Sequence, residues 1–346
     1  MILEEDIQNI YIGLKKAEID LLSGKTILIT GFAGSLGFML VQFLNTHRFA
    51  KKVYLIDNYV FGKPNWVEKL DKSYFSIIEG DVIITSFPPE ANLIFHMASL
   101  ASPVYYRKHP IETMDADVIG LRRLLDFYKD KNIYNLLFYS TSEIYGDAEK
   151  VPTTETYWGN VNPVGPRACY DESKRYGETM CYNFHNVHGF PVSIIRPFNS
   201  YGPGLRINDK RAPADFAMNV LNNEDIFLYS NGKSTRTFCY NTDLTIASLK
   251  IILKQKFDVY NAGNDQNEIT IEELANLYKD IGQKLFGYRG NIVYKTHTDK
   301  HYNTDDPKRR CPDLTKIKQE LRYVPQVDVS QGVERYLSYL ATDIQG

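Results

Sequence analysis

The sequence has few cysteines, and they lack the spacing of a scaffold. Four occur in 346 residues, and none forms a CxxC pair. So few scattered thiols exclude a fold built on disulfides and fit a reducing compartment. The first residues also lack the basic start and apolar middle of a signal peptide. We therefore expect a cytoplasmic protein.

Long apolar runs and an excess of charge are missing as well. No stretch of about 18 apolar residues occurs, so no membrane span is expected. The net charge of −2 gives no general attraction for nucleic acid or an anionic membrane, and neither is expected as a partner. An anionic substrate must therefore be bound by locally placed Arg and Lys. No metal site is predicted.

What is present is a pattern of short apolar runs that alternate with helical stretches. The runs lie at 25–30, 53–56, 93–95, 136–139, 192–195 and 257–260, and the clearest helices at 111–128 and 170–188. Nearly continuous apolar runs are typical of strands buried on both faces. Their alternation with helices predicts a Rossmann-type doubly wound parallel sheet, an α/β fold, with a smaller α/β substrate lobe.

The same pattern suggests a division of the chain. Residues 1–24 are predicted to form an N-terminal amphipathic helix extension, with apolar side chains at helical spacing. Residues 25–203 are expected to form the dinucleotide-binding domain, to which 237–262 return. Residues 204–236 and 263–346 lose the regular alternation and are assigned to the smaller lobe.

A glycine loop follows the first apolar run and opens a helix. Gly31, Gly34 and Gly37 have the spacing GxxGxxG. Glycine lets the backbone approach a pyrophosphate closely, and the helix N-terminus directs N–H groups at the negative charge. Asp57 ends the second strand, 20 residues after Gly37, where an acid accepts bonds from a ribose and repels a 2′-phosphate. This predicts NAD as the cofactor.

Tyr170 and Lys174 form a second pattern, in the helix at 170–188. One helical turn places both side chains on the same face. A nearby ammonium is expected to lower the pKa of the tyrosine and make Tyr170 a base near neutral pH. The YxxxK spacing also occurs at Tyr11 and at Tyr229, but only Tyr170 follows the strand end Ser140-Thr141-Ser142-Glu143.

Together these stretches resemble the extended short-chain dehydrogenase/reductase superfamily, and within it UDP-glucuronate decarboxylase, also called UDP-xylose synthase. The specific signatures are 96–103, 140–146, 305–313 and above all the run YWGNVNPVGPRACYDESKR at 157–175. The glycine loop departs from the family pattern at Ser35-Leu36. The segments 202–211 and 238–241, in the nucleotide-binding region, also depart from it. The resemblance implies an NAD-dependent enzyme that oxidises a nucleotide-linked sugar at C4.

The resemblance also implies roles for individual residues. Thr141 is expected to bond the sugar O4 beside Tyr170, Glu143 to lie near C5 and C6, and Arg310 to face the C6 carboxylate. Asn199 is expected at the phosphate region and Arg236 at the diphosphate. The predicted catalytic residues are Thr141, Ser142, Glu143, Tyr170, Lys174 and Arg310. The predicted cofactor-binding residues are Gly31, Ala33, Gly34, Ser35, Leu36, Gly37, Asp57, Asn58, Asp81, Val82, Met97, Ala98, Tyr170 and Lys174. The predicted substrate-binding residues are Ser102, Tyr105, Asn199, Arg206, Arg211, Tyr229 and Arg236.

Several rival functions stay open at this point. A 4,6-dehydratase needs an acid beside Glu143, where this chain has Ser142, which is a poor acid. A 4-epimerase, a net 4-dehydrogenase and a non-catalytic NAD or nucleotide-sugar sensor are also compatible with the sequence. The resemblance further implies a homodimer in which helices 111–128 and 170–188 pair across a two-fold axis. The expected small-molecule partner is a UDP-linked sugar.

Overall fold

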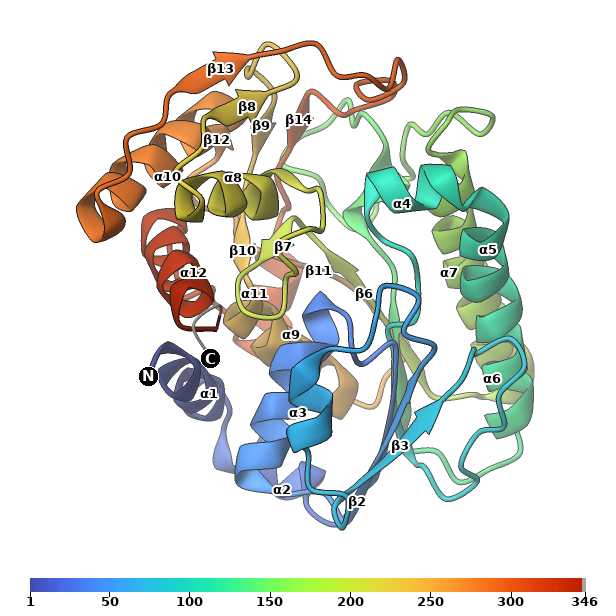
Figure 1. Cartoon of the computed structure of the whole chain (residues 1–346). Helices are drawn as coiled ribbons and strands as arrows, with labels where there is room; N and C mark the ends of the chain where they lie inside the picture. The colour runs from blue at the N-terminus through green and yellow to red at the C-terminus, as the bar shows by residue number, and fades with distance from the viewer. Residues whose placement is uncertain (344–346) are drawn as a thin grey trace.

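The computed structural model describes residues 1–343, and its largest feature is a parallel sheet of seven strands (Figure 1). The strand order is β11-β6-β5-β4-β1-β2-β3, and every neighbouring pair is parallel. The strands are β1 (Thr26–Thr30), β2 (Lys52–Asp57), β3 (Phe75–Glu79), β4 (Leu93–His96), β5 (Asn135–Tyr139), β6 (Val192–Pro197) and β11 (Val259–Ala262). The order reverses between β1 and β4, as in a Rossmann fold, and the predicted fold class is confirmed.

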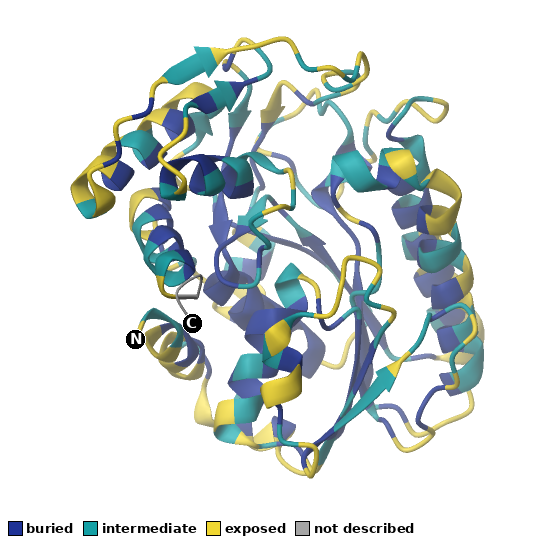
Figure 2. Cartoon of the chain, in the orientation of Figure 1, coloured by how far each residue is buried: buried dark blue, intermediate teal, exposed yellow. Residues whose placement is uncertain are grey.

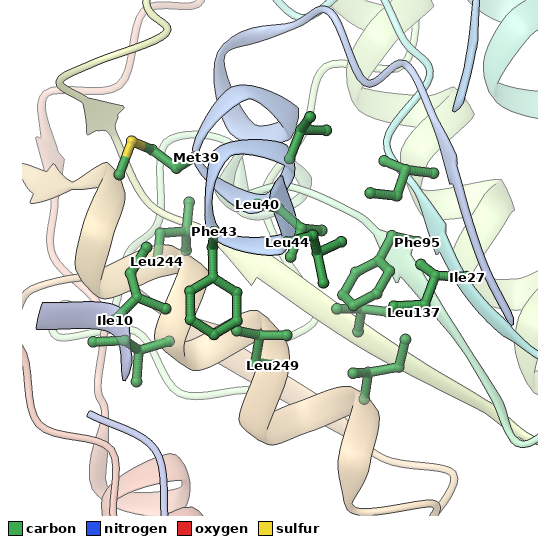
Figure 3. Close-up of a cluster of buried hydrophobic side chains, with 14 of the residues drawn as sticks. Ile10, Ile27, Met39, Leu40, Phe43, Leu44, Phe95, Leu137, Leu244 and Leu249 are labelled. Atoms are coloured by element: carbon green, nitrogen blue, oxygen red, sulfur yellow. The ribbon is translucent and has the colours of Figure 1, made fainter. Parts of the chain in front are cut away.

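The sheet is covered by helices on both faces, as its apolar strands require. Ile27 and Ile29 of β1 point into one core cluster and Leu28 into another, because side chains alternate along a strand. The first cluster is closed by α3 (Ser35–His47) and α9 (Asn241–Leu253), and Figure 3 shows how their side chains meet those of the sheet. The second is closed by α6 (Leu121–Tyr128) and α7 (Ala168–His188). Figure 2 shows the buried sheet between the two layers.

The N-terminal extension forms two helices where one was predicted. These are α1 (Ile2–Ile12) and α2 (Lys16–Leu22). The break lies at Gly13, where an added Cβ would stand 2.6 Å from Ile246 Cδ1 of α9. Glycine therefore lets the end of α1 approach α9 closely, and Glu18 then caps α2 by accepting a bond from the Lys15 N–H.

The predicted helix at 111–128 is also interrupted. It consists of α5 (Pro110–Met114), the π-helical turn η2 (Asp115–Gly120) and α6. The last predicted strand starts later than expected, since the ring of Phe257 packs on His185 and Tyr182 of α7 before β11 begins.

A second, smaller core holds the outer lobe together. Its buried residues lie between Tyr201 and Leu340 in the sequence and include Tyr278 and Tyr336. The helices of this part are α8 (Ala212–Leu221), α10 (Ile271–Phe286) and α12 (Val329–Asp343). Its strands are β8 (Ile226–Leu228) and β13 (Ile292–Tyr294), which pair, and β9 (Thr235–Arg236), β12 (Ile269–Thr270) and β14 (Arg309–Arg310), which form a three-stranded sheet. Figure 1 places this lobe at the opposite end from α2.

One segment expected in the smaller lobe packs on the main sheet. Helix α11 (Thr315–Leu321) places Ile317 and Leu321 in the first core cluster, together with Tyr323. The remaining elements are η1 (Asn65–Lys69), α4 (Pro103–Lys108), η3 (Ser142–Tyr145), β7 (Ser200–Tyr201) and β10 (Cys239–Tyr240). Among the helices of residues 1–343, none has both the length and the apolar character needed to cross a bilayer.

Candidate active site

The predicted site residues converge on one cavity of about 710 Å³ between the main sheet and the smaller lobe. Every residue of the predicted catalytic, cofactor-binding and substrate-binding sets lines it, with the exception of Lys174. Such a volume is in the range of small-molecule sites. The cavity lies at the carboxyl ends of β1, β2, β4, β5 and β6, where open α/β sheets bind their ligands.

The cofactor end of the cavity is built mainly from backbone. Gly31 has a φ of +71°, and a Cβ there would stand 2.6 Å from the backbone of Ala98. A Cβ on Gly37 would stand 2.3 Å from the carbonyl oxygen of Phe32. Only glycine fits at these two positions, so the loop can turn tightly into α3 and present its N-terminus to the cavity. This cradle fits a dinucleotide pyrophosphate.

Asp57 lies beside this loop. Its carboxylate accepts bonds from the backbone N–H of Ala33 (3.0 Å) and of Tyr59 (2.8 Å). Burial raises the pKa of Asp57, while these two bonds and the positive charge of Arg206 act in the opposite direction. Next to it, Asn58 donates to Asp81 (2.9 Å), which orders the ends of β2 and β3.

Arg206 was predicted to contact the substrate, and its guanidinium lies at the cofactor end. It donates to the carbonyl oxygens of Phe61 and of Gly62 (2.5 and 3.1 Å). A third bond of 3.5 Å reaches the carbonyl of Ala33 in the glycine loop. Arg206 thus ties the segment after β7 to the two loops that surround Asp57.

Tyr170 lies where the two ends of the cavity meet, in the first turn of α7. Its ring is buried and stacks on Tyr106 of α4, with centroids 5.0 Å apart and planes 2° from parallel. Thr141 of the β5 end forms a side-chain hydrogen bond with Tyr170. Thr141 itself is fixed because it caps η3, accepting from the Glu143 N–H at 3.2 Å. The predicted pairing of Tyr170 with the Ser-Thr-Ser-Glu strand end is therefore present.

The predicted electrostatic role of Lys174 is contradicted. Its Nζ lies behind the tyrosine, 5.8 Å from the ring centroid, and binds Asp117 (3.0 Å) and the carbonyl of Tyr139 (3.0 Å). Burial, and next the charge of Asp117, raise the pKa of Tyr170, although the bond with Thr141 lowers it. The ammonium is neutralised by its partner, so the protein alone does not make Tyr170 a base near neutral pH.

The opposite end of the cavity contains three buried arginines. Arg236 and Arg310 are direct neighbours in the parallel pair of β9 and β14, so strand pairing sets them side by side. Arg167 approaches from the residue before α7. All three are at least nine-tenths buried.

Two carboxylates balance these arginines incompletely. Glu143 accepts two bonds from Arg310 and one of 2.5 Å from Arg167. Asp306 pairs with Arg236 (3.1 Å) and lies 3.7 Å from Arg167. Burial opposes the ionisation of Glu143, but the charges of Arg167 and Arg310 outweigh it and hold its pKa below the ordinary range. Three cations and two anions leave one positive charge in excess, which suits an anionic substrate group.

The other predicted substrate residues shape the opening between the lobes. Ser102 and Tyr105 hydrogen-bond the carbonyls of Asp209 and Asn208 (2.8 and 3.3 Å). Arg211 is paired with Asp209. Asn199, which has a φ of 30°, donates to the Thr237 carbonyl (3.1 Å). The ring of Tyr229 packs edge-on against His297 and Tyr302. Within residues 1–343, no His, Cys, Asp and Glu side chains gather as metal ligands would.

Three residues of this site were not singled out from the sequence. Arg167 stands inside the YWG–SKR run, so its place in that signature was an available signal. Asp306 lies in the Asp-Asp-Pro stretch near the C-terminus, and its pairing with Arg236 depends on long-range packing. Asp117 lies in the helix predicted at 111–128, and no local sequence pattern marks it as the partner of Lys174.

Comparisons with known proteins agree with this geometry. Residues 27–263 match the NAD dependent epimerase/dehydratase family. UDP-glucuronic acid decarboxylase 1 of Xenopus tropicalis is 37% identical over 322 residues, which cover 93% of this chain and 73% of the relative. UDP-glucuronic acid decarboxylase 6 of Arabidopsis thaliana is 36% identical over 312 residues, covering 90% of this chain and 87% of the relative.

Solved structures give the same result for the fold. UDP-glucose 4-epimerase of Thermotoga maritima, crystallised with UDP-glucose, superposes with a TM-score of 0.78 at 25% identity and covers 92% of this chain and 99% of its own. UDP-glucuronic acid 4-epimerase of Bacillus cereus, crystallised with NAD, reaches 0.77 at 23% identity, with 93% and 98% covered. By sequence over most of its length and by fold, the chain belongs to the NAD dependent epimerase/dehydratase family.

Proposed function

We propose that the chain is an NAD-dependent decarboxylase that converts UDP-glucuronate to UDP-xylose through a 4-keto intermediate. The observation that carries this proposal is the arginine cluster around Glu143, which ends the same cavity that holds Tyr170 and Thr141. A substrate carboxylate supplies the negative charge that the cluster lacks. The UDP-glucuronic acid decarboxylases of Xenopus and Arabidopsis support the choice of sugar.

The glycine cradle and Asp57 would hold NAD, which accepts a hydride from C4 of the sugar and later returns it. Tyr170 removes the proton from the C4 hydroxyl and later returns it to the same oxygen. Thr141 bonds that oxygen, and its position as the cap of η3 keeps it aimed at Tyr170. The two side chains therefore fix where oxidation takes place.

The arginines and Glu143 act at the other end of the sugar. Once C4 is a ketone, the C6 carboxylate belongs to a β-keto acid. The C5–C6 bond breaks, its electron pair forms an enolate on C4 and C5, and CO2 leaves. A proton taken up from the solvent then adds at C5, in the place of the lost carboxylate, before C4 is reduced again. Arg310 and Arg167 orient the carboxylate, and Glu143 shares them, so the carboxylate must displace part of an existing ion pair.

Ser142 separates this proposal from dehydration. A 4,6-dehydratase must protonate a leaving C6 hydroxyl, and Ser142 beside Glu143 is a poor acid. Glu143 itself is held ionised by two arginines, so it has no proton to give at neutral pH. Both residues favour decarboxylation.

The decisive experiment is incubation of the purified protein with NAD and a panel of nucleotide sugars, followed by mass spectrometry. Decarboxylation of UDP-glucuronate removes the mass of CO2. Loss of water would indicate a dehydratase, loss of two hydrogens a dehydrogenase, and an isomer of equal mass a 4-epimerase. No turnover of any sugar, with NAD bound, would indicate a sensor.

A homodimer formed by the segment 111–128 (α5, η2 and α6) and by α7 is part of the proposal. These helices lie side by side on one edge of the molecule (Figure 1). They expose Ile111, Ile119, Tyr176 and Val187. A second copy would cover these side chains. Ile119→Glu should shift the protein toward monomer in light scattering, whereas Val164→Glu, at an exposed loop position, should not.

The cellular compartment and the division into domains are also part of the proposal. The four free thiols, three of them buried, suit a reducing compartment, and we place the protein in the cytoplasm. The division into a dinucleotide-binding domain (25–203 with 237–262), a substrate lobe (204–236 and 263–346, of which 344–346 lie outside the described residues) and an N-terminal extension (1–24) stays a proposal, with the exception that α11 packs on the main sheet. Limited proteolysis would test it.

A further inference from the structure

Asp117 is a buried carboxylate beneath the candidate base. Its side chain is fully shielded from solvent and lies 3.0 Å from Lys174 Nζ. Its second oxygen accepts a bond of 2.9 Å from the Ser173 hydroxyl. Asp117 does not line the cavity, so it cannot contact a bound sugar. Whatever Asp117 does for the reaction, it does through Lys174.

The backbone around Asp117 is specialised for this contact. Asp117 lies in η2, the π-helical turn between α5 and α6. A π turn has hydrogen bonds from residue i to i+5, is rare, and frequently occurs at functional sites. Here η2 packs against α7, and the turn carries Asp117 to Lys174 and Ser173 on that helix.

The titratable groups around Tyr170 come from α4, η2, η3, α7 and the residue before α8. Tyr106 of α4 stacks on it, and Asp117 faces it from η2. Glu143 of η3 adds negative charge, Arg211 before α8 adds positive charge, and Lys174 lies behind the ring. Burial, followed by the charge of Glu143, raises the pKa of Asp171 of α7 to about 8, so this carboxyl is largely uncharged at neutral pH. Glu143 is balanced by two arginines and Arg211 by Asp209. Asp117 is therefore the acid whose pairing decides how much of the Lys174 charge reaches Tyr170.

We propose that Asp117 is a positioning residue that acts through its ion pair with Lys174 and sets the pH range in which Tyr170 accepts the substrate proton. The pair holds the ammonium at a fixed place and cancels most of its field at the phenol. Tyr170 consequently remains a neutral phenol in the protein alone. This inference rests on the proposed function, in which Tyr170 is the base, and adds the residue that tunes it.

The sign of the effect follows from the charge removed. Tyr170 acts as a base only when deprotonated, so sugar oxidation must rise as the pH passes the pKa of Tyr170. Asp117→Asn keeps the shape of the side chain and removes one negative charge. The Lys174 charge is then uncompensated, which favours the tyrosinate and moves the rise to lower pH by about 1 to 2 pH units.

The test uses two readouts, one of which needs neither cofactor nor substrate. Protein labelled with 13Cζ-tyrosine is titrated by NMR, and the Tyr170 signal is the one that Tyr170→Phe removes. In the unmodified protein this signal should titrate above the ordinary value of about 10. In Asp117→Asn its midpoint should fall by about 1 to 2 pH units. The second readout is the pH profile of NADH formation, whose rising limb should move by the same amount.

Asp115→Asn is the matched control, because it makes the same substitution on the same π turn. It should leave both midpoints in place. The proposal is overturned if the Tyr170 midpoint of Asp117→Asn equals that of the unmodified protein, which would make Asp117 structural. Should Asp117→Asn not fold, a Tyr170 midpoint at or below about 10 in the unmodified protein overturns it equally. If the NMR midpoint moves and no sugar is oxidised, the proposed function fails, whereas the control of Tyr170 ionisation by Asp117 stands.

Discussion

The two ends of the cavity recognise their ligands by different means. At the cofactor end, glycines bring the backbone close, and Asp57 is fixed by two backbone N–H groups. At the substrate end, three buried arginines share two carboxylates. The first end depends on steric fit and the second on unbalanced charge. A substitution at the cofactor end should therefore act by changing the steric fit, and one at the substrate end by changing the charge.

Tyr170, between the two ends, should give the largest effect. Tyr170→Phe removes the proton acceptor and keeps the ring that stacks on Tyr106. Turnover should fall by about a hundredfold to ten-thousandfold, while binding of NAD and nucleotide sugar stays normal. Single-turnover NADH formation and calorimetric binding measure the two quantities. Tyr106→Phe is the control, because it also removes one buried hydroxyl and keeps the stacked rings, and it should lose little activity. Equal losses in both variants would show that any lost hydroxyl in this stack lowers turnover, and that Tyr170 is not the specific proton acceptor.

The substrate end should respond to the loss of one guanidinium. Arg310→Lys keeps a positive charge but loses the two parallel bonds to Glu143. A hydrogen bond to a charged group contributes about 1.5 to 3 kcal/mol, so decarboxylation should fall about tenfold to a hundredfold. NADH formation with UDP-glucose, which has no carboxylate, should change much less.

Arg309→Lys provides the control for Arg310, since Arg309 precedes it in β14 and points to Glu268 at the surface. Release of CO2 from UDP-glucuronate should remain normal in this variant. If Arg310→Lys slows the oxidation of UDP-glucuronate and of UDP-glucose equally, Arg310 stabilises the lobe and does not recognise the substrate carboxylate.

The same comparison explains what could be predicted from the sequence. The glycine loop, Asp57 and the YxxxK pair are local patterns, and the buried runs predicted the sheet because its central strands, such as β1 and β5, are buried on both faces. The arginine cluster joins residues from 143 to 310, so only the resemblance suggested Arg310, and Arg167 was overlooked. The lowered pKa predicted for Tyr170 was wrong because its supposed activator has a buried partner in a π turn.

The cofactor end should respond to an added methyl group. Gly31→Ala places a Cβ 2.6 Å from the backbone of Ala98, and such overpacking costs about 1 to 3 kcal/mol. Gly24→Ala is a matched control, because Gly24 has nearly the same φ (+72° against +71°) and nothing within 4 Å of its Cβ position. Chemical denaturation and NAD titration should show Gly31→Ala to be the less stable variant and the weaker binder. Similar results for the two would mean that φ alone matters.

Asp57 should give the smallest effect, and it tests whether charge also matters at the cofactor end. The unmodified protein should prefer NAD, because Asp57 repels a 2′-phosphate. Asp57→Ala removes this repulsion and frees Arg206, whose charge acts on Asp57, to bind the phosphate. The preference should relax by about tenfold, roughly the contribution of one hydrogen bond to a charged group. The ratio of the two cofactor affinities is the quantity to measure, because loss of the bond to Ala33 weakens both. In the double variant Asp57→Ala/Arg206→Ala the part of the relaxation that comes from Arg206 should disappear, which leaves a smaller relaxation than in Asp57→Ala. If the relaxation is undiminished, repulsion by Asp57 alone sets the preference, and equal use of both cofactors by the unmodified protein would remove Asp57 from the selection altogether.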